Sequence, residues 1–167
     1  MIRLSVESDK EEIKHLVELC FGNRLHCGYL NNLSGRYLLK IVEGNIVAMS
    51  GLNNNTPYEN GLEVDWTCTH PNYRKCGYMH EIFEQMIPLT NGNIYCSCWH
   101  LEGKENVELY SLMRDFNFEC IKPAHKIGKS NECNCFNITD CVNYNLGCTC
   151  QEDLYIRKSL GGSCVEK

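Results

Sequence analysis

The stretch HPNYRKCGYMHEIF, residues 70–83, combines residue types that together bind anions. Pro71 ends the preceding element, Arg74 and Lys75 supply positive charge, and Gly77 stands at the start of an apolar helix. The first-turn N–H groups of a helix and its dipole favour negative charge, and glycine allows the backbone close approach to a ligand. The stretch therefore predicts a phosphate-binding loop, with an ordinary strand–helix connection as the alternative. It matches neither a Walker A loop nor a dinucleotide fingerprint.

Two kinds of side chain near this loop have reactive chemistry. Alternation along residues 62–69 places the carboxylates of Glu63 and Asp65 on one face of a strand, where the alternative is a pair of solvent-facing polar residues. Cys68 and Cys76 are thiols in the same region, and a nucleophilic cysteine needs a lowered pKa and a positioned base. A nucleophilic cysteine is therefore an alternative to the carboxylates in this region.

The elements that must position these residues follow from periodicity and capping. Ser8 and Glu11 form a capping box for a helix whose apolar face contains Ile13, Leu16 and Val17. Residues 36–52 read as a hairpin with its turn at Gly44–Asn45. Further strands are expected over residues 2–7, 62–69, 93–100, 118–127 and 153–160. Further helices are expected after Gly77 and after Asn106, and a short helix within the polar stretch 23–35.

This order predicts an α/β fold (in the sense of an α+β mixed sheet), with a central twisted sheet flanked by helices. In this sheet, one central strand–helix–strand step is parallel. We expect a single domain over residues 1–160, with a Cys-rich insertion at about 128–151 and a flexible tail over 161–167. A chain of 167 residues is long enough for a sizeable core.

Composition restricts the function. A net charge of -5 and a pI near 5.7 argue against a nucleic-acid partner, whose binding face is usually basic. No apolar run approaches the length of a membrane span, and the first residues lack the apolar stretch of a signal peptide, so we expect a cytoplasmic protein without membrane contact. The oligomeric state stays open.

The segment VDWTCTHPNYRKCGYMHEIFEQMI resembles the acetyl-CoA-binding motif of the GNAT superfamily of N-acetyltransferases. The family pattern is Arg/Gln-x-x-Gly-x-Gly/Ala, and it corresponds here to Arg74 through Met79, with Met79 in place of the final Gly/Ala. The late segment NVELYSLMRDFNF is similar to a second family feature, a helix that begins at Asn106 and closes with Asn117–Phe118 instead of Gly-Phe. The resemblance covers residues 2 to about 127 and the last strand.

The resemblance implies a GNAT-like acyltransferase fold that binds acetyl-CoA where its two central strands splay apart. The backbone of Thr67, Cys68 and Thr69 is expected to pair with the pantetheine arm, which Asn106 also reaches. The implied pyrophosphate cradle is made of the backbone N–H groups of six consecutive residues: Arg74, Lys75, Cys76, Gly77, Tyr78 and Met79.

The same resemblance implies direct acetyl transfer to an amine in a ternary complex. Glu63 matches the strand Glu that acts as base in histone-type members, with Asp65 as the neighbour to test. The family position of the acid falls on Met113, which has no proton to donate. Tyr110 lies one turn earlier and is the predicted acid; the alternatives are that it only packs and that water protonates the thiolate. The acceptor is a small-molecule or peptide amine. The alternative function is a catalytically silent acyl-CoA-binding or zinc-stabilised module.

Thirteen cysteines are unusual for a chain of this size. Cys20, Cys68, Cys96, Cys98 and Cys120 lie in apolar patterns and are expected to be small buried hydrophobic residues. Thiols at high density in the segment from Cys133 to Cys150 favour a structural zinc site in a reducing compartment. The expected ligands are Cys135, Cys141, Cys148 and Cys150, with Cys133 as the alternate; free thiols or disulfides are the other readings.

Overall fold

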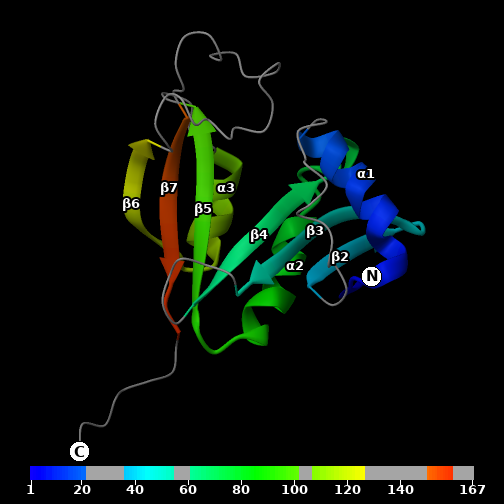
Figure 1. Ribbon diagram of the computed structural model, residues 1–167, viewed down its shortest axis with the longest axis horizontal. Coiled ribbons are helices and arrows are strands. Elements are labelled where there is room, and N and C mark those ends of the chain that lie inside the picture. Colours follow the sequence, from blue (N-terminus) through cyan, green and yellow to red (C-terminus); the bar gives the residue numbers. More distant parts are fainter. Residues whose placement is uncertain (22–35, 55–60, 102–106, 127–149, 160–167) are drawn as a thin grey trace, which may run out of the picture.

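The computed structural model describes residues 1–21, 36–54, 61–101, 107–126 and 150–159 (Figure 1). The strands are β1 (Ile2–Leu4), β2 (Tyr37–Val42), β3 (Asn45–Asn53), β4 (Gly61–Thr69), β5 (Asn93–Leu101), β6 (Glu119–Lys126) and β7 (Cys150–Arg157). The helices are α1 (Lys10–Phe21), α2 (Tyr78–Met86) and α3 (Val107–Asp115), with short 3₁₀ helices at Glu7–Asp9, Pro71–Tyr73 and Ile87–Leu89.

The described strands form one mixed sheet in the order β1-β2-β3-β4-β5-β7-β6. Neighbouring strands pair antiparallel except β4 and β5, which run parallel and are connected through α2. The predicted mixed sheet and its single parallel step are confirmed. A parallel pair needs a crossover of this kind because its strand ends lie at opposite edges.

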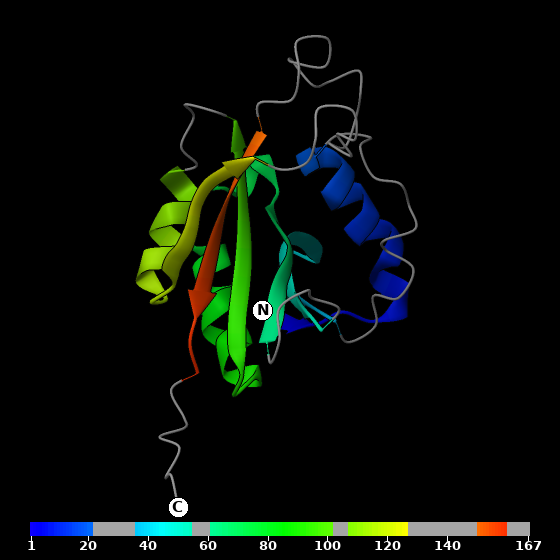
Figure 2. The same cartoon turned by 60° about the vertical axis from the view of Figure 1, so that its left-hand side comes forward.

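Helices cover both faces of the sheet, with α1 on one side and α2 and α3 on the other (Figure 2). Successive residues of β2 alternate between the two sides: Leu38 packs in the cluster under α2, whereas Tyr37 and Leu39 pack in the cluster under α1. We call these the α2-side cluster and the α1-side cluster. The α1-side cluster consists of Ile13, Leu16, Val17, Tyr37, Leu39, Ile46, Met49 and Cys68.

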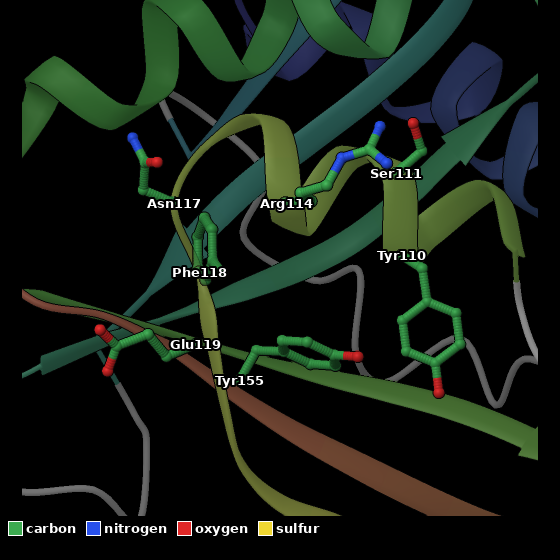
Figure 3. Close-up of a pocket in the computed structure, with 7 residues that line it drawn as sticks. All are labelled: Tyr110, Ser111, Arg114, Asn117, Phe118, Glu119 and Tyr155. Atoms are coloured by element: carbon green, nitrogen blue, oxygen red, sulfur yellow. The ribbon is translucent and has the colours of Figure 1, made fainter.

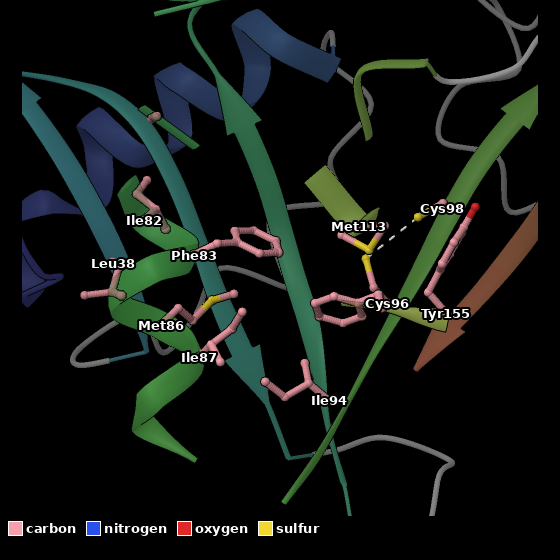
Figure 4. Close-up of a cluster of buried hydrophobic side chains, with 12 residues drawn as sticks. Leu38, Ile82, Phe83, Met86, Ile87, Ile94, Cys96, Cys98, Met113 and Tyr155 are labelled. Atoms are coloured by element: carbon pink, nitrogen blue, oxygen red, sulfur yellow. Dashed lines mark hydrogen bonds between the residues drawn. The ribbon is translucent and has the colours of Figure 1, made fainter. Parts of the chain in front are cut away.

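The α2-side cluster is the larger one and joins both halves of the sheet (Figure 4). Ile82 and Phe83 of α2 are fully buried in it, and Met113 of α3 is also 0% exposed. Full burial of one such side chain stabilises the fold by about 1.5–3 kcal/mol. The core therefore holds α2 and α3 against strands that are distant from them in sequence.

The β2–β3 hairpin forms as predicted, but its turn lies one residue earlier than expected. Glu43 and Gly44 are the two turn residues, with φ of 51° and 85°. Asn45 already belongs to β3, and its side-chain amide donates to the Glu43 carbonyl at 3.2 Å. A two-residue hairpin turn that matches the strand twist needs positive φ at both positions, so Glu43 takes a conformation that its side chain disfavours.

Further expectations differ from the structure. The first strand ends at Leu4 instead of residue 7, and Asp9, in place of Glu11, accepts from the preceding backbone at the N–H of Val6. Cys120 is exposed and Cys20 half-buried, whereas Cys68, Cys96 and Cys98 are buried as predicted. The last strand runs over 150–157 instead of 153–160, because it pairs with β5 along the whole length from Ile94 to Leu101. A local hydrophobic pattern does not contain this long-range register.

Other predictions lie outside the described residues, including the short helix over 23–35 and most of the Cys-rich insertion. The single domain, the insertion boundaries and the tail stay predictions. Among the described residues, no helix has the length and apolar character that a membrane crossing requires.

Candidate functional site

The middle of the sheet opens where β4 and β5 separate (Figure 1). Their parallel register consists of Gly61, Leu62 and Glu63 of β4 opposite residues 93–95 of β5. Beyond Glu63, β4 continues beside β3, while β5 continues beside β7 up to Leu101. The predicted divergence of the two central strands is thus present, with the final residues of β4 along one side of the opening.

A β-bulge in β4 lies next to this opening. Met49 of β3 pairs with Cys68 and Gly51 pairs with Asp65, so two residues of β4 oppose the single residue between them on β3. Trp66, in the bulge, has a φ of 44°. Because a bulge shifts the alternation by one residue, the side chains of Asp65 and Cys68 both contact the α1-side cluster.

Asp65 is fixed by two partners from the start of β2. The Arg36 guanidinium lies 2.5 Å from its carboxylate, and the Tyr37 hydroxyl donates to the same oxygen at 3.0 Å. Burial raises the pKa of Asp65, and Arg36 and Tyr37 act in the opposite direction. Burial and the nearby Asp65 charge also raise the pKa of Tyr37, so this phenol stays protonated. The three side chains form one hydrogen-bonded group.

Glu63 lies two residues before Asp65, at the point where the strands diverge. Its carboxylate accepts a hydrogen bond from Ser97 of β5 at 3.2 Å. Ser97 belongs to the α1-facing side of β5, since its neighbours Cys96 and Cys98 face the α2-side cluster.

The loop between β4 and α2 has the geometry of a helix-terminal anion site. Lys75 and Gly77 have φ of 63° and 77°, and Gly77 is the N-cap residue of α2. The first backbone hydrogen bond of the helix runs from Glu81 to the Gly77 carbonyl at 3.1 Å. The N–H groups of residues 78–80 therefore precede the intrahelical ladder and face the end of the helix, where Arg74 and Lys75 add positive charge.

Two contacts hold the first turn of α2 against the sheet. Lys40 of β2 is only 9% exposed, and its ammonium lies 2.5 Å from Glu81 and 4.6 Å from the ring centre of Tyr78. Met79 packs against the α2-side cluster. The bulky residue at the last motif position thus has its side chain in the core, while its backbone stays at the helix start.

The end of β4 is tied to the last turn of α1. Cys20 donates a hydrogen bond from its thiol to the Thr69 carbonyl at 3.3 Å, and Arg74 donates from Nε to the same oxygen at 3.4 Å. Thr67 faces the other side of the sheet, where its hydroxyl lies 2.8 Å from that of buried Ser50. Cys68 is 5% exposed, and Cys76 is exposed.

The predicted acid, Tyr110, donates its hydroxyl proton to the carboxylate of Asp153 on β7. Asp153 is 3% exposed, and the Tyr110 ring lies edge-on to Tyr155 with 6.0 Å between centroids. Met113, at the family position of the acid, is a fully buried core residue beside the thiols of Cys96 and Cys98 (Figure 4). Asn106 lies outside the described residues.

A groove of about 770 Å³ lies along α3, beside β6 and β7 (Figure 3). Its lining residues are Tyr110, Ser111, Arg114, Asn117, Phe118, Glu119 and Tyr155. No residue of the loop from His70 to Gly77 lines it, so this groove is separate from the predicted phosphate site.

The predicted metal ligands cannot be placed by the structure. Cys135, Cys141 and Cys148 lie outside the described residues, and Cys150 is the first residue of β7 with no side-chain description. Among the described side chains, no group of three or more His, Cys, Asp or Glu residues has the arrangement of a metal site.

The structure brings together residues that the sequence reasoning missed. Arg36 and Tyr37 join Asp65, Ser97 joins Glu63, and Cys20 joins Cys68 and Arg74. The contact of Arg36 and Tyr37 with Asp65 follows from the register of the β2–β3–β4 meander. This register places Tyr37 opposite Gly51 and Gly51 opposite Asp65. For Cys20, helical periodicity placed it on the buried face but did not show what lay opposite.

Comparison with known proteins identifies solved structures with a similar fold. No protein-family model matches this sequence, and no curated protein matches it. Among solved structures, it is similar to the ribosomal-protein-S18-alanine N-acetyltransferase from Escherichia coli, with a TM-score of 0.66 at 12% identity over 100% of this chain and 99% of that one. Arabidopsis thaliana NAA60 in complex with a bisubstrate analogue has a TM-score of 0.69 at 12% identity, covering 97% of this chain and 99% of that one.

A GNAT-family acetyltransferase from Bacillus cereus also matches, with a TM-score of 0.64 at 16% identity over 96% of this chain and 98% of that one. These similarities extend over nearly the full length of each chain. The chain therefore has the fold of the GNAT acetyltransferases.

Proposed function

We propose that this protein is an acetyl-CoA-dependent N-acetyltransferase that transfers an acetyl group directly to a primary amine in a ternary complex. The observation that carries this proposal is the opening between β4 and β5 beside a cationic helix N-terminus, on a GNAT fold. An opening of this kind exposes strand backbone to a ligand at one end and first-turn N–H groups at the other.

In this proposal, the backbone of Thr67, Cys68 and Thr69 pairs with the pantetheine arm along the side of β4 opposite β3. The N–H groups of residues 74–79 bind the pyrophosphate, and Arg74 and Lys75 add charge. Asn106 reaches the pantetheine arm. Lys40 has an indirect role, because its contacts with Glu81 and Tyr78 fix the position of the helix start.

Glu63 is the proposed general base. It takes a proton from the acceptor ammonium, and the neutral amine attacks the thioester carbonyl carbon. The C–S bond breaks to release coenzyme A as a thiolate, and the nitrogen loses its extra proton to water to give the amide. Asp65 is a poorer base, because Arg36 and Tyr37 already use its carboxylate. Ser97 orients Glu63 through the hydrogen bond between them.

The leaving thiolate needs a proton, and two sources are compatible with the contacts. Tyr110 is the predicted side-chain acid, but its proton is directed at buried Asp153, which supports a structural role. We therefore propose protonation by water. Cys68 is a poor nucleophile for an acyl-enzyme route, because its hydrogen bond with Cys20 and its burial raise the pKa of Cys68 well above the ordinary value.

We also propose a structural zinc bound by Cys135, Cys141, Cys148 and Cys150, with Cys133 as the alternate. This proposal is supported by the density of thiols in the sequence alone. The acceptor class stays a primary amine of a small molecule or peptide.

The deciding experiment uses the full chain with acetyl-CoA and a panel of primary amines: a polyamine, a free amino acid and a peptide with a free N-terminus. Released coenzyme A and acetylated amine are measured by chromatography and mass spectrometry, because the 13 protein cysteines would react with a thiol reagent. Multiple turnovers with equal amounts of both products would support the proposal. Acetyl-CoA stabilisation in a thermal melt without turnover would favour the silent binding module, and the absence of both would reject acetyl-CoA as the ligand.

A further inference from the structure

Two thiols meet at the end of the strand that we propose binds acetyl-CoA. Cys20, in the last turn of α1, packs against the α1-side cluster that contains buried Cys68 of β4. The Cys20 thiol donates to the carbonyl of Thr69, the residue next to Cys68, at 3.3 Å. Cys20 is half-buried and Cys68 is 5% exposed, so a reagent from solvent meets Cys20 first.

Arg74 is the third member of this group. Its Nε donates to the same Thr69 carbonyl that Cys20 contacts, at 3.4 Å. The hydrogen bond from Cys68 lowers the pKa of Cys20 to about 7, and the positive charge of Arg74 acts in the same direction against the effect of burial. The lowered pKa of Cys20 favours loss of its thiol proton, and the thiolate is the reactive form of a cysteine.

We propose that Cys20 and Cys68 form an oxidisable thiol pair, which a peroxide converts to a disulfide that joins the end of α1 to β4. The Cys20 thiolate attacks one peroxide oxygen, the O–O bond breaks, and the departing oxygen leaves as water after taking a proton. The sulfur of Cys68 then attacks the resulting sulfenic acid, and the second water leaves with the Cys68 proton. The two thiols lose two electrons in total, and one hydrogen peroxide becomes two waters.

The pair lies beside the proposed phosphate loop, and this part of the inference depends on the proposed function. If Arg74 binds the pyrophosphate of acetyl-CoA, its charge is no longer available to Cys20, and the thioester ligand covers the end of β4. Acetyl-CoA should therefore slow oxidation of the pair.

The test oxidises the reduced full chain briefly with hydrogen peroxide, alkylates the remaining thiols and digests the protein with trypsin. Cleavage after Lys14, Arg24, Lys40 and Arg74 gives peptides 15–24 and 41–74, which contain Cys20 and Cys68 respectively as their sole cysteine. We expect these two peptides to appear cross-linked in the mass spectrum. If Cys68 is alkylated while Cys20 is oxidised alone or linked to another cysteine, the proposed pair is wrong.

Three variants make the assignment specific. Cys20→Ser should leave Cys68 as a free thiol under the same peroxide treatment, and Arg74→Gln should slow cross-linking in the free protein. Cys76→Ser is the matched control, because Cys76 is an exposed thiol of the same loop that does not belong to the pair; cross-linking should be unchanged. Unchanged cross-linking in Arg74→Gln would reject the role of its charge.

The ligand experiment separates this inference from the proposed function. With acetyl-CoA at ten times its Kd, cross-linking should slow about tenfold, because only about one molecule in eleven stays free. If a thermal melt shows that acetyl-CoA does not bind, the proposed function fails and the cross-link stands by itself. If acetyl-CoA binds but leaves the rate of cross-linking unchanged, the link through Arg74 is overturned.

Discussion

At the scale of single residues, the site has two carboxylates in different environments. Asp65 is held by a guanidinium and a phenol, whereas Glu63 accepts from a serine hydroxyl. A general base must give up its proton repeatedly, so a carboxylate that is already bound in an ion pair serves structure better than catalysis. The ion pair favours Asp65 as a positioning residue for the contact between β2 and β4, and Glu63 stays the proposed base.

Replacing Glu63 by glutamine should lower kcat by roughly 10²–10⁴-fold at neutral pH, the usual contribution of a general base. The amide keeps the shape and its carbonyl still accepts from Ser97, so the Kd for acetyl-CoA should change little. Steady-state kinetics and a separate binding titration check this prediction. A parallel loss of binding and turnover would indicate a structural role instead.

Asp65 should affect the pH dependence of stability. Its folded-state pKa is raised above the ordinary value of 3.8, so the folded protein holds the proton more tightly than the unfolded chain. The contribution of Asp65 to stability therefore falls as pH rises from 3.8 through the raised pKa. The free energy of unfolding of wild type minus that of Asp65→Asn should decrease over this window. Denaturant titrations at several pH values measure it, and a difference that grows with pH would contradict the assignment.

At the scale of elements, the start of α2 depends on both backbone conformation and side-chain contacts. Gly77 has a φ of 77°, and a Cβ added there would meet no atom within 4 Å. A substitution at this position therefore acts through the left-handed conformation rather than through a clash. Lys40 adds a contact from β2 that holds the first turn in place.

Gly77→Val should lower the free energy of unfolding by about 1–2 kcal/mol, the cost of a left-handed L-residue, and should weaken acetyl-CoA binding because the first-turn amides shift. Gly77→Asn is the matched control, since asparagine adopts positive φ more readily. A thermal melt and a binding titration compare the two variants. Equal behaviour of valine and asparagine would show that the backbone conformation of this residue is not the important property.

The elements with strong local periodicity were predictable from sequence. The α1 face around Ile13 and Leu16, the β2–β3 hairpin and the β4–α2–β5 step each follow from residues close together in the chain. The contacts of the site were not predictable from sequence, because they join residues that are distant in the chain. Tyr37 contacts Asp65 only after three strands align, and Cys20 approaches Cys68 only after α1 packs on β4. The bulge at Trp66 changes which β4 residues share a face, and alternation alone does not predict it.

At the scale of the whole molecule, the sheet has two halves that meet at β4 and β5, and the opening lies between them. The α2-side cluster spans both halves, since it contains Leu38 and Ala48 from one half and Cys96 and Tyr155 from the other. The opening therefore lies beside a core that is continuous across both halves of the sheet.

The Cys-rich segment should affect the stability of the whole sheet, because β7 follows it directly and lies between β5 and β6. If zinc is bound, protein purified under reducing conditions should contain stoichiometric metal, and a chelator should lower Tm. Cys148→Ser should reduce the metal content, whereas Cys76→Ser should not. Elemental analysis and melts check this prediction, and the absence of stoichiometric metal would reject the site.

The central claim is that acetyl-CoA binds in the opening between β4 and β5 and at the start of α2. Hydrogen–deuterium exchange of the full chain with and without acetyl-CoA tests it most directly, because exchange reports on each backbone N–H. The account predicts slower exchange over residues 64–69 and 74–80 in the presence of acetyl-CoA, with little change in β1 and β2. Binding that slows exchange only elsewhere, for example around Arg114 and Glu119 in the groove beside α3, would contradict it.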